Sequence, residues 1–289
     1  MKTVLVCGAG GFVGRQIVQA LRTAGLAVIE GLSADQNFAR DVDVPTWLPR
    51  LDGVDAVINA VGVLRDSAGR PMDAVHHRAP AALFQACAER GLRRVIQISA
   101  LGIAGSQTLY ARSKRAGDEA LLSLRAQGRL DGVVLRPSIV FGRAGASSQL
   151  FMRLAGLPLL VLPAAALRAR VQPLAVQDLG LACLRLLQLE GRDTPALQPA
   201  VGPQALSVAD FIQALRRQQG HGAARVLALP EAPSRWSARL GDHLPFQPWC
   251  SETLVLLQQD NCGDAAGFQA LLGRPAVAPE KLVAQAWQQ

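Results

Sequence analysis

Aromatic residues are scarce in this chain. They make up 4% of its 289 residues, and Tyr110 is the only tyrosine. Proteins that bind single-stranded nucleic acid stack the bases on aromatic side chains, so this scarcity argues against a nucleic-acid partner. The net charge of +8 rests on scattered arginines, with lysine only at Lys2, Lys114 and Lys281. That charge is still compatible with an anionic partner such as a nucleotide, an acidic protein or a lipid headgroup.

Cysteine and histidine are few, and neither follows the spacing of a metal site. The chain holds five cysteines and four histidines. An odd number of cysteines without metal-ligand spacing predicts reduced, structural thiols and a cytoplasmic protein. His76 and His77 are adjacent rather than four residues apart, and no cysteine or carboxylate cluster accompanies them. We therefore expect no metal, and we expect the histidines to contribute little to function.

Long hydrophobic runs are missing as well. No stretch approaches the roughly 20 apolar residues that a helix needs to cross a bilayer, and nothing at the N-terminus resembles a signal peptide. The most apolar stretch, residues 157–163, is expected to form a buried loop. Apolar residues nevertheless make up 50% of the chain and charged residues 18%, which is typical of a globular protein.

What the chain does have is a glycine-rich turn near its start. Residues 3–7 are apolar and largely β-branched, and they predict a buried strand. Gly8, Gly11 and Gly14 follow at three-residue spacing, and residues 15–24 have the apolar spacing of a helix. A strand that turns on glycines into a helix presents unpaired N–H groups and a partial positive charge, which stabilise a pyrophosphate. The turn therefore predicts a dinucleotide site.

Strands and helices alternate through the first half of the chain. Such alternation indicates a parallel sheet with helices on both faces and with ligands at the carboxyl ends of its strands. The predicted fold is α/β, a Rossmann-type doubly wound parallel sheet with a smaller C-terminal α/β lobe. After the first strand and helix, the predicted strands are residues 26–32, 54–62, 95–99 and 133–136, and the predicted helices are 47–51 (a short helix or turn), 72–90 and 110–127.

The alternation weakens after Gly142. Ser207 is expected to cap a helix that begins at residue 208. The other expectations are a loop at 144–148, helices at 149–155, 179–189 and 208–219, a linker-like passage at 195–203 and a strand at 225–229. We predict an NAD(P)-binding domain of residues 1–142 with about 170–190, and a smaller substrate or partner lobe of residues 143–169 and 191–289.

Tyr110 and Lys114 lie four residues apart on a predicted helix, so their side chains share one face. A nearby ammonium favours the phenolate and lowers a tyrosine pKa that is otherwise about 10. The pair therefore predicts a tyrosine that acts as general acid or base near neutral pH. The alternative is an amphipathic helix that carries both residues by chance. The preceding glycine turn and the strand that ends at Ser99 favour the functional interpretation.

These features occur together in one family. The chain resembles the extended or atypical branch of the short-chain dehydrogenase/reductases, which are NAD-dependent epimerase/dehydratase-like. Within it, the chain is most similar to the group related to the nucleotide-binding accessory subunit of respiratory complex I. The matching residues, in the family's order, are Gly8 to Gly14, Asp41 and Val42, Asn59 to Gly62, Ile98 and Ser99, Tyr110 to Lys114, Leu135 to Pro137 with Phe141 and Gly142, and Val176 to Leu179.

The resemblance implies a nicotinamide dinucleotide cofactor and roles for particular residues. Tyr110, Lys114 and Ser99 would form the catalytic set, and Asp41 with Val42 would contact the adenine. The residues implied to bind the cofactor are Gly8, Gly10, Gly11, Phe12, Val13, Gly14, Arg15, Ser33, Asp41, Val42, Ala60, Val61, Gly62, Ser99, Tyr110, Lys114, Pro137 and Ser138, the last two beside the nicotinamide carboxamide.

For some positions the residues alone leave a structural role open. Asp41 can be a turn residue, Asn59 a strand-end cap, and Arg136 a partner of Asp178. The second strand also leaves the cofactor's phosphorylation open. An acidic side chain at its end favours NAD, whereas positive charge favours the 2′-phosphate of NADP.

Ser33 stands near that deciding position, and Arg15 and Arg40 are the arginines that could meet a phosphate. The prediction is therefore NADP(H) rather than NAD(H).

At one catalytic position the chain departs from the family pattern. Active family members carry a Ser or Thr just beyond the strand end, where this chain has Leu101 and Gly102.

Either Ser99 or Ser106 takes that role, or the protein binds nucleotide without turnover. Two functions follow. The first is an oxidoreductase or epimerase of an unidentified small carbonyl or alcohol that uses Tyr110 as general acid or base. The alternative is a non-catalytic nucleotide sensor or an accessory subunit of a redox complex, with contact to that complex or to a membrane surface.

Overall fold

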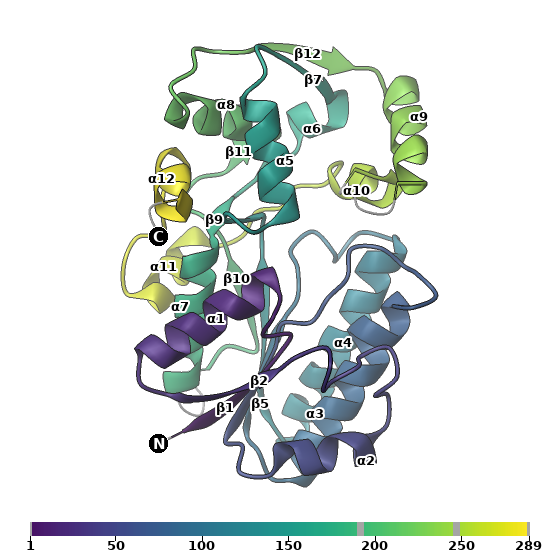
Figure 1. Cartoon of the computed structure of the whole chain (residues 1–289), viewed down its shortest axis with the longest axis vertical. Helices are drawn as coiled ribbons and strands as arrows, with labels where there is room; N and C mark the ends of the chain where they lie inside the picture. The colour runs from purple at the N-terminus through teal and green to yellow at the C-terminus, as the bar shows by residue number, and fades with distance from the viewer. Residues whose placement is uncertain (1, 190–193, 245–248, 288–289) are drawn as a thin grey trace. The chain divides into compact units, whose positions relative to one another are not determined.

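The computed structural model describes residues 2–189, 194–244 and 249–287 and divides into two compact units (Figure 1). The first unit comprises Met1–Pro137 and Gln177–Pro199, and the second comprises Ser138–Val176 and Ala200–Gln289. The parts of the two predicted domains that fall on residues 190–193, 245–248 and 288–289 lie outside the described residues.

A six-stranded sheet forms the centre of the first unit, in the order β10–β5–β4–β3–β1–β2. The neighbouring pairs from β5 to β2 are parallel. All four residues of β3 are buried, as expected for a strand covered on both faces. The bounds of the strands are β1 Thr3–Cys7, β2 Ala27–Gly31, β3 Ala56–Asn59, β4 Arg94–Ile98, β5 Asp131–Pro137 and β10 Leu197–Ala200.

Helices cover both faces of this sheet, with α1 and α7 on one side and α3 and α4 on the other (Figure 1). The predicted doubly wound α/β fold is confirmed. The bounds are α1 Phe12–Thr23, α2 Val44–Trp47 followed by a 3-10 turn at Leu48–Leu51, α3 Ala79–Glu89, α4 Leu109–Ala126 and α7 Val176–Gln188.

The glycine turn between β1 and α1 has the tight geometry that its spacing predicts. Gly8 adopts a φ of 77°, a left-handed conformation that favours glycine. A Cβ on Gly14 would collide with the carbonyl oxygen of Gly8, so only glycine allows the helix to pack against the strand. Gly11 is the N-cap of α1, and the helix therefore begins three residues earlier than its apolar spacing suggested.

The helix predicted over residues 72–90 is not uniform. Residues Ala74–Arg78 form one turn of π-helix, and α3 continues from Ala79. A π-helical turn is rare and is often found at functional sites, because it shifts the side chains that follow. Here the turn carries His76, which is fully buried.

The second unit has its own core, formed by apolar side chains of α5, β7, α6, α8 and α12. The predicted N-cap is confirmed, because the Ser207 hydroxyl accepts a hydrogen bond from the Asp210 N–H at 3.0 Å. The bounds are β6 Val140–Phe141, α5 Ala146–Ala155, β7 Leu159–Pro163, α6 Ala164–Arg168, β8 Arg170–Val171, β9 Leu174–Ala175, β11 Leu206–Ser207, α8 Val208–Gln218, β12 Arg225–Leu229, α9 Glu231–Asp242, α10 Ser251–Leu256, α11 Ala265–Leu272, a 3-10 turn Pro279–Lys281 and α12 Leu282–Trp287.

Three local predictions are wrong. Residues 144–148 do not form a loop throughout, because α5 already begins at Ala146. The linker-like passage at 195–203 contains β10, which hydrogen-bonds to β5 as the edge of the central sheet. Residues 157–163 are not a buried loop, because β7 pairs with β12 and exposes alternate side chains. Short apolar or proline-rich stretches become strands only when a distant partner supplies the hydrogen bonds, which local pattern does not reveal.

None of the described helices is long and apolar enough to cross a membrane. Within the same described ranges, no group of three or more His, Cys, Asp and Glu side chains lies close enough to hold a metal ion. The five cysteines are free thiols, and Cys7, Cys87, Cys183 and Cys250 are buried.

Candidate functional site

A groove of about 630 Å³ opens at the carboxyl ends of β1, β2 and β3. Because β1 lies between the other two strands, this is the switch point of the sheet, where doubly wound folds bind ligands. Of the predicted cofactor residues, Gly8, Gly10, Gly11, Ser33, Ala60, Val61 and Gly62 line this switch-point groove. Four others, Phe12, Val13, Gly14 and Arg15, form the first turn of α1 and are not among its lining residues.

The turn after β3 is held by Asn59. Its side-chain amide donates to the Gln97 side chain at 2.8 Å, and its oxygen accepts from the Val61 N–H at 3.1 Å. Asn59 is thus a cap at the end of its strand, which is the structural role that the sequence left open for it. The cap fixes the backbone of residues 60–62 where they line the groove.

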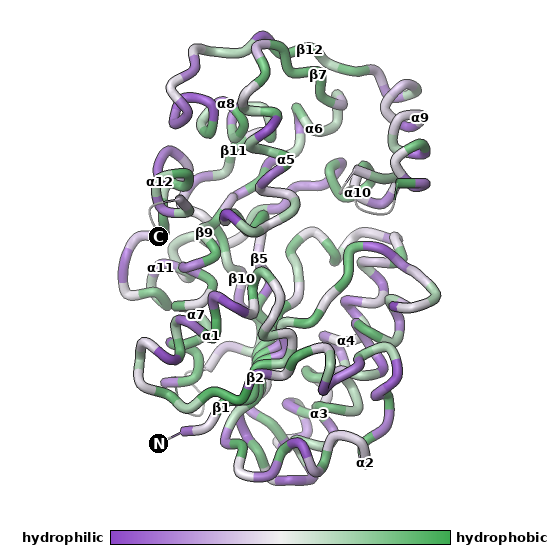
Figure 2. Tube along the Cα trace, in the orientation of Figure 1, coloured by the Kyte–Doolittle hydropathy of each residue, from purple (hydrophilic) through white to green (hydrophobic). Residues whose placement is uncertain are grey.

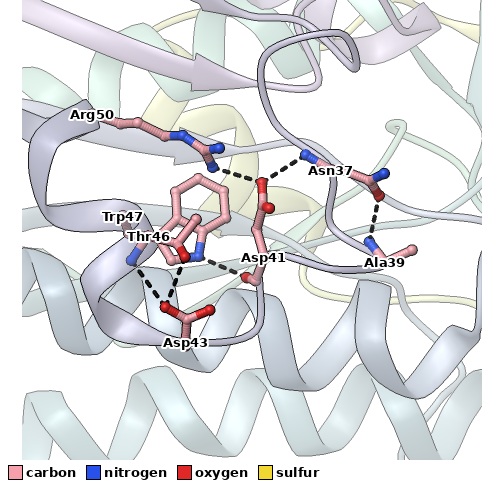
Figure 3. A network of polar contacts seen from close by, with 7 residues as sticks. All are labelled: Asn37, Ala39, Asp41, Asp43, Thr46, Trp47 and Arg50. Carbon is pink, nitrogen blue, oxygen red and sulfur yellow. Dashed lines mark hydrogen bonds and ion pairs between the residues drawn. The ribbon is translucent and has the colours of Figure 1, made fainter.

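Asp41 supports the wall of the groove (Figure 3). Its carboxylate pairs with Arg50 at 2.6 Å and accepts from the Asn37 N–H at 2.7 Å, and its carbonyl accepts from the Trp47 indole at 2.8 Å. Both Asp41 and Val42 are half-buried and do not line the groove, whereas Asn37 does. The acid therefore fixes the conformation of the loop that forms one side of the groove.

Gln36 and Arg70 are among the lining residues that the sequence analysis did not single out. Gln36 is 7% exposed, and its Oε1 has no hydrogen-bond partner within the described residues. A Cβ on Gly31 would overlap this amide, so a glycine at the end of β2 makes room for it. Arg70 reaches the groove from a turn closed by its own N–H on Ser67. Both sit in loops without periodic pattern, and only the folded chain brings them to the groove.

The residues around this groove fit a dinucleotide. Glycines form the floor, where the backbone can approach a phosphate, and α1 begins there with its free N–H groups. An unpartnered buried amide and an arginine face the same space, and no aspartate or glutamate is among the described lining residues. A polar acceptor without a partner is costly to bury, so a bound ribose whose hydroxyl donates to Gln36 Oε1 would relieve that cost.

Helix α4 brings Tyr110 and Lys114 beside the groove. Thr108 caps the helix by accepting from the Ala111 N–H. Lys114 is 5% exposed, and its ammonium donates to the Ile98 carbonyl at 3.3 Å. A Cβ on Gly62 would lie 3.1 Å from Lys114 Nζ, so the ammonium lies directly against the groove wall.

The expected lowering of the Tyr110 pKa is wrong for this structure. Burial raises the pKa of Tyr110 to about 12, and the negative charge of Asp118 adds to the rise. Burial also lowers the pKa of Lys114 to about 8, against the opposing effect of Asp118. Desolvation shifts both pKa values more than the neighbouring charges do. The spacing of the two residues in the sequence carries no information about desolvation. Tyr110 is therefore a phenol rather than a phenolate at neutral pH.

Ser99 takes part in a buried charge network. Its hydroxyl donates to Asp118 Oδ2 at 2.8 Å, and the Arg136 guanidinium donates to the same oxygen at 2.8 and 3.0 Å. Asp118 has no solvent exposure. Arg136 thus pairs with Asp118, a partner the sequence analysis had not considered for it.

The remaining candidate residues, Ser106, Pro137 and Ser138, also have structural partners. Ser106 shares a hydrogen bond with Thr108 at 3.1 Å at the start of α4. Pro137 ends β5, and its carbonyl accepts from the Leu101 N–H. Ser138 opens the second unit, where its hydroxyl donates to the Asn261 carbonyl at 2.8 Å.

His76 makes buried contacts beside the groove that the sequence analysis did not foresee. Its Nε2 accepts from the Val63 N–H at 3.0 Å, and its Nδ1 lies 2.9 Å from the Ser113 hydroxyl, which donates to the Tyr110 carbonyl. Since Nε2 accepts, Nδ1 carries the proton and donates to Ser113. The imidazole also packs edge-on against the Tyr110 ring at 5.5 Å. It thereby ties the loop that lines the groove to the helix that carries the tyrosine.

Burial keeps this imidazole neutral. It lowers the pKa of His76 to about 2, with a contribution from the nearby Lys114 ammonium. Gly117 allows the close approach behind this contact, because a Cβ there would collide with the His76 carbonyl oxygen. In the sequence, the helical spacing of His76 with the apolar residues Ala79 and Leu83 was the one local signal available.

Comparison with known proteins agrees with this architecture. The chain is 28% identical over 188 residues to the protein named ceramide reductase of Caulobacter vibrioides, which covers 61% of this chain and 57% of that protein. It is 28% identical over 156 residues to the mitochondrial NADH dehydrogenase [ubiquinone] 1 alpha subcomplex subunit 9 of Arabidopsis thaliana. This match covers 47% of this chain and 38% of that protein. The chain thus spans about half the length of these curated relatives, or less.

Among solved structures, RMD from Pseudomonas aeruginosa complexed with NADPH has a TM-score of 0.70 at 18% identity. The match covers 99% of this chain and 97% of that one, and at this identity it shows a shared fold. The family model matches residues 4–195, which include the glycine turn, the switch-point groove and helix α4. The chain therefore belongs to the NAD dependent epimerase/dehydratase family.

Proposed function

We propose that the chain is an NAD(P)(H)-dependent oxidoreductase or epimerase that acts on a small carbonyl or alcohol, with Tyr110 as its proton donor. The observation that carries the proposal is the placement of Lys114 Nζ against Gly62 of the groove, one helical turn from Tyr110. Family membership and the name of the reductase relative support the same class of reaction.

The protonation state of Tyr110 supports its proposed role as a proton donor. A nicotinamide dinucleotide supplies hydride transfer when it is bound. With its pKa raised to about 12, Tyr110 holds its proton at neutral pH and can give it to a carbonyl oxygen that gains negative charge. Lys114 lies against Gly62 of the groove, one helical turn from Tyr110, where it can bond ribose hydroxyls and stabilise that negative charge.

Replacement of Tyr110 by Phe tests this role. We expect Tyr110→Phe to lower kcat by about 100-fold or more, since a positioned general acid contributes at least that much. The dissociation constants of NADH and NADPH should stay unchanged, because the phenol does not line the groove. The measurements are absorbance of the reduced nicotinamide with a panel of aldehydes and ketones, and calorimetry for binding. Equal turnover by the two proteins would contradict the proposal.

A second function has specific support. Ser99 and Ser106, the two hydroxyls that could polarise a substrate carbonyl, are hydrogen-bonded to Asp118 and Thr108. The chain would then be a nucleotide-binding module without turnover, as the name of the complex I relative suggests. Retained dinucleotide binding with no consumption of any substrate by the wild-type protein would favour this function over catalysis.

We further propose that the cofactor is NADP(H), with Arg70 at the 2′-phosphate. Arg70 and Ser33 both line the groove, whereas Arg15 and Arg40 do not. No acidic side chain among the described lining residues opposes a phosphate there. The Gln36 amide, which has an unpartnered oxygen, can turn so that its NH₂ donates to the phosphate.

Arg70→Gln should therefore weaken NADPH binding about tenfold or more and leave NADH binding nearly unchanged, since a hydrogen bond to a charged group contributes about 1.5–3 kcal/mol. Titration of the intrinsic fluorescence or calorimetry gives both dissociation constants. Arg40→Gln is the matched control, because Arg40 is exposed in the same region without lining the groove. The assignment fails if wild-type protein binds NADH as tightly as NADPH, or if the control behaves like Arg70→Gln.

The substrate remains a small carbonyl or alcohol in this proposal, and the protein is proposed to act in the cytoplasm. Reduced thiols are expected in that compartment, which agrees with the five free cysteines. Contact with a redox complex is a second partner to test, on the strength of the complex I relative.

A further inference from the structure

The second unit exposes the outer face of a small parallel sheet. Leu159 and Val161 on β7 and Leu227 on β12 are 43%, 49% and 54% exposed. Leu227 pairs with Val161 in the register of the sheet, so these side chains share one face. The opposite face carries Leu160 and Leu162, which are buried in the core of the unit. Figure 2 shows that both strands are largely hydrophobic along their traces.

Helix α9 follows β12 after a single proline and also exposes large apolar side chains. Trp236 is 67% exposed, and Leu240, one turn later, is 50% exposed. The buried side of the helix consists of Ser234, Ala238 and Gly241, which recur at helical spacing. An ordinary surface helix turns its large apolar residues toward the core. Here the small residues face the core and the large ones face outward, which indicates an occupant other than this unit.

Positive charge accompanies both apolar faces. Arg225 is the register partner of Leu159, so it lies on the outer face of the sheet. Arg239 is exposed on α9 three residues after Trp236, on the same side of the helix. Residues 138–176, which include β7, contain four arginines and no aspartate or glutamate. One arginine therefore accompanies the apolar side chains of each face, Arg225 on the sheet and Arg239 on α9.

The nearest acidic side chains are already engaged. Glu231 at the start of α9 pairs with Arg235 at 3.4 Å. Asp242 at its end accepts hydrogen bonds from the Ser251 N–H and hydroxyl at 2.8 and 2.6 Å. The structure thus bonds Glu231 and Asp242 to partners other than Arg225 and Arg239. The charge that these arginines offer is thus available to an anionic partner.

We propose that the outer face of the β7–β12 sheet and the outer side of α9 dock on an anionic lipid bilayer. Tryptophan and leucine insert at the boundary between headgroups and acyl chains, and arginines pair with the headgroups above it. An apolar face alone would suit another protein equally well, but the flanking arginines provide charge complementarity to anionic lipid. The sheet face comprises Leu159, Val161, Arg225 and Leu227, and the helix face comprises Trp236, Arg239 and Leu240.

Vesicle binding of the full chain tests the proposal without any nucleotide, so its failure is distinguishable from failure of the proposed function. We expect co-sedimentation with vesicles of phosphatidylglycerol and phosphatidylcholine, and little with phosphatidylcholine alone. Arg225→Gln and Arg239→Gln should each weaken binding about fivefold, since one basic residue near such a surface contributes about 1 kcal/mol. Arg90→Gln with Arg93→Gln is the matched control, which removes two exposed charges from the first unit.

Tryptophan substitutions give a second readout. Trp236→Ala should weaken vesicle binding, whereas Trp236→Phe should keep it and lose the blue shift of fluorescence that insertion causes. Unchanged circular dichroism would show that each variant is folded. The proposal is overturned if anionic vesicles are not bound, or if the control charges matter as much. It is also overturned if sedimentation shows a dimer that Trp236→Ala dissociates, because the occupant is then a second copy of the chain.

Discussion

Removal of the Asp118 carboxylate should destabilise the protein by about 3–5 kcal/mol. Asp118 is inaccessible to solvent, and one of its oxygens accepts three hydrogen bonds, one from Ser99 and two from Arg136. In Asp118→Ala the guanidinium of Arg136, whose side chain is 17% exposed, would remain without its anion. Breaking a buried pair from one side is costly, because the remaining charge is neither paired nor fully hydrated. Urea unfolding of both proteins measures the difference.

An exposed ion pair of the first unit, between Arg93 and Asp131, provides the control. Asp131 faces Arg93 at 3.8 Å, and the arginine side chain is 79% exposed. Asp131→Ala should cost less than about 1 kcal/mol, since water screens an exposed pair. Similar losses for the two variants would show that burial of the Asp118 network is not what stabilises it. Asp118→Ala should also lower the pKa of Tyr110, because the Asp118 charge is one of the two causes that raise it.

Acidification should destabilise the protein through His76. The pKa of the buried imidazole is about 2, whereas an unfolded chain has a histidine pKa of about 6.5. Below about pH 6.5 the unfolded state binds a proton that the folded state does not, so stability falls as the pH falls. Between about pH 7.5 and about pH 5 this single group should remove about 2 kcal/mol. Lys114 adds little to this slope, because with a folded pKa of about 8 it is mostly charged in both states over that range.

His76→Gln separates this effect from other titrations. Glutamine can still accept the Val63 N–H but cannot titrate, so urea unfolding of the variant should lose about 2 kcal/mol less on acidification. His77→Gln is the matched control, because the His77 side chain is 39% exposed and bonds to Asp73. Its pH dependence should equal that of the wild type. If His76→Gln shows the wild-type slope, the imidazole is not held neutral by burial.

A positioning role for His76 predicts an effect on turnover as well. The imidazole links the Val63 N–H, near the groove, to Ser113 and so to the backbone of Tyr110. Loss of that link should lower kcat more than it changes the affinity for the dinucleotide, since the groove itself is built from other residues.

Much of the fold could be predicted because it follows local pattern. The strand at Thr3–Cys7 and the strand at Arg225–Leu229 were predicted with the bounds that the structure shows. The glycine spacing predicted the turn, since a Cβ on Gly14 would meet the backbone of that same turn. The pairing of β10 with β5 could not be predicted, because its partner is some 60 residues away and its prolines suggested a linker.

The amino-acid sequence by itself determined the family, the glycine turn and the one-turn spacing of Tyr110 and Lys114, because these depend on neighbours within a few residues. The tertiary structure alone decided the protonation of Tyr110, the partners of His76 and Asp118, and which side of residues 157–163 faces outward. These properties depend on burial and on contacts between segments 18 or more residues apart, such as His76 with Ser113 and Asp118 with Arg136. Local periodicity in the sequence encodes neither burial nor these long-range contacts.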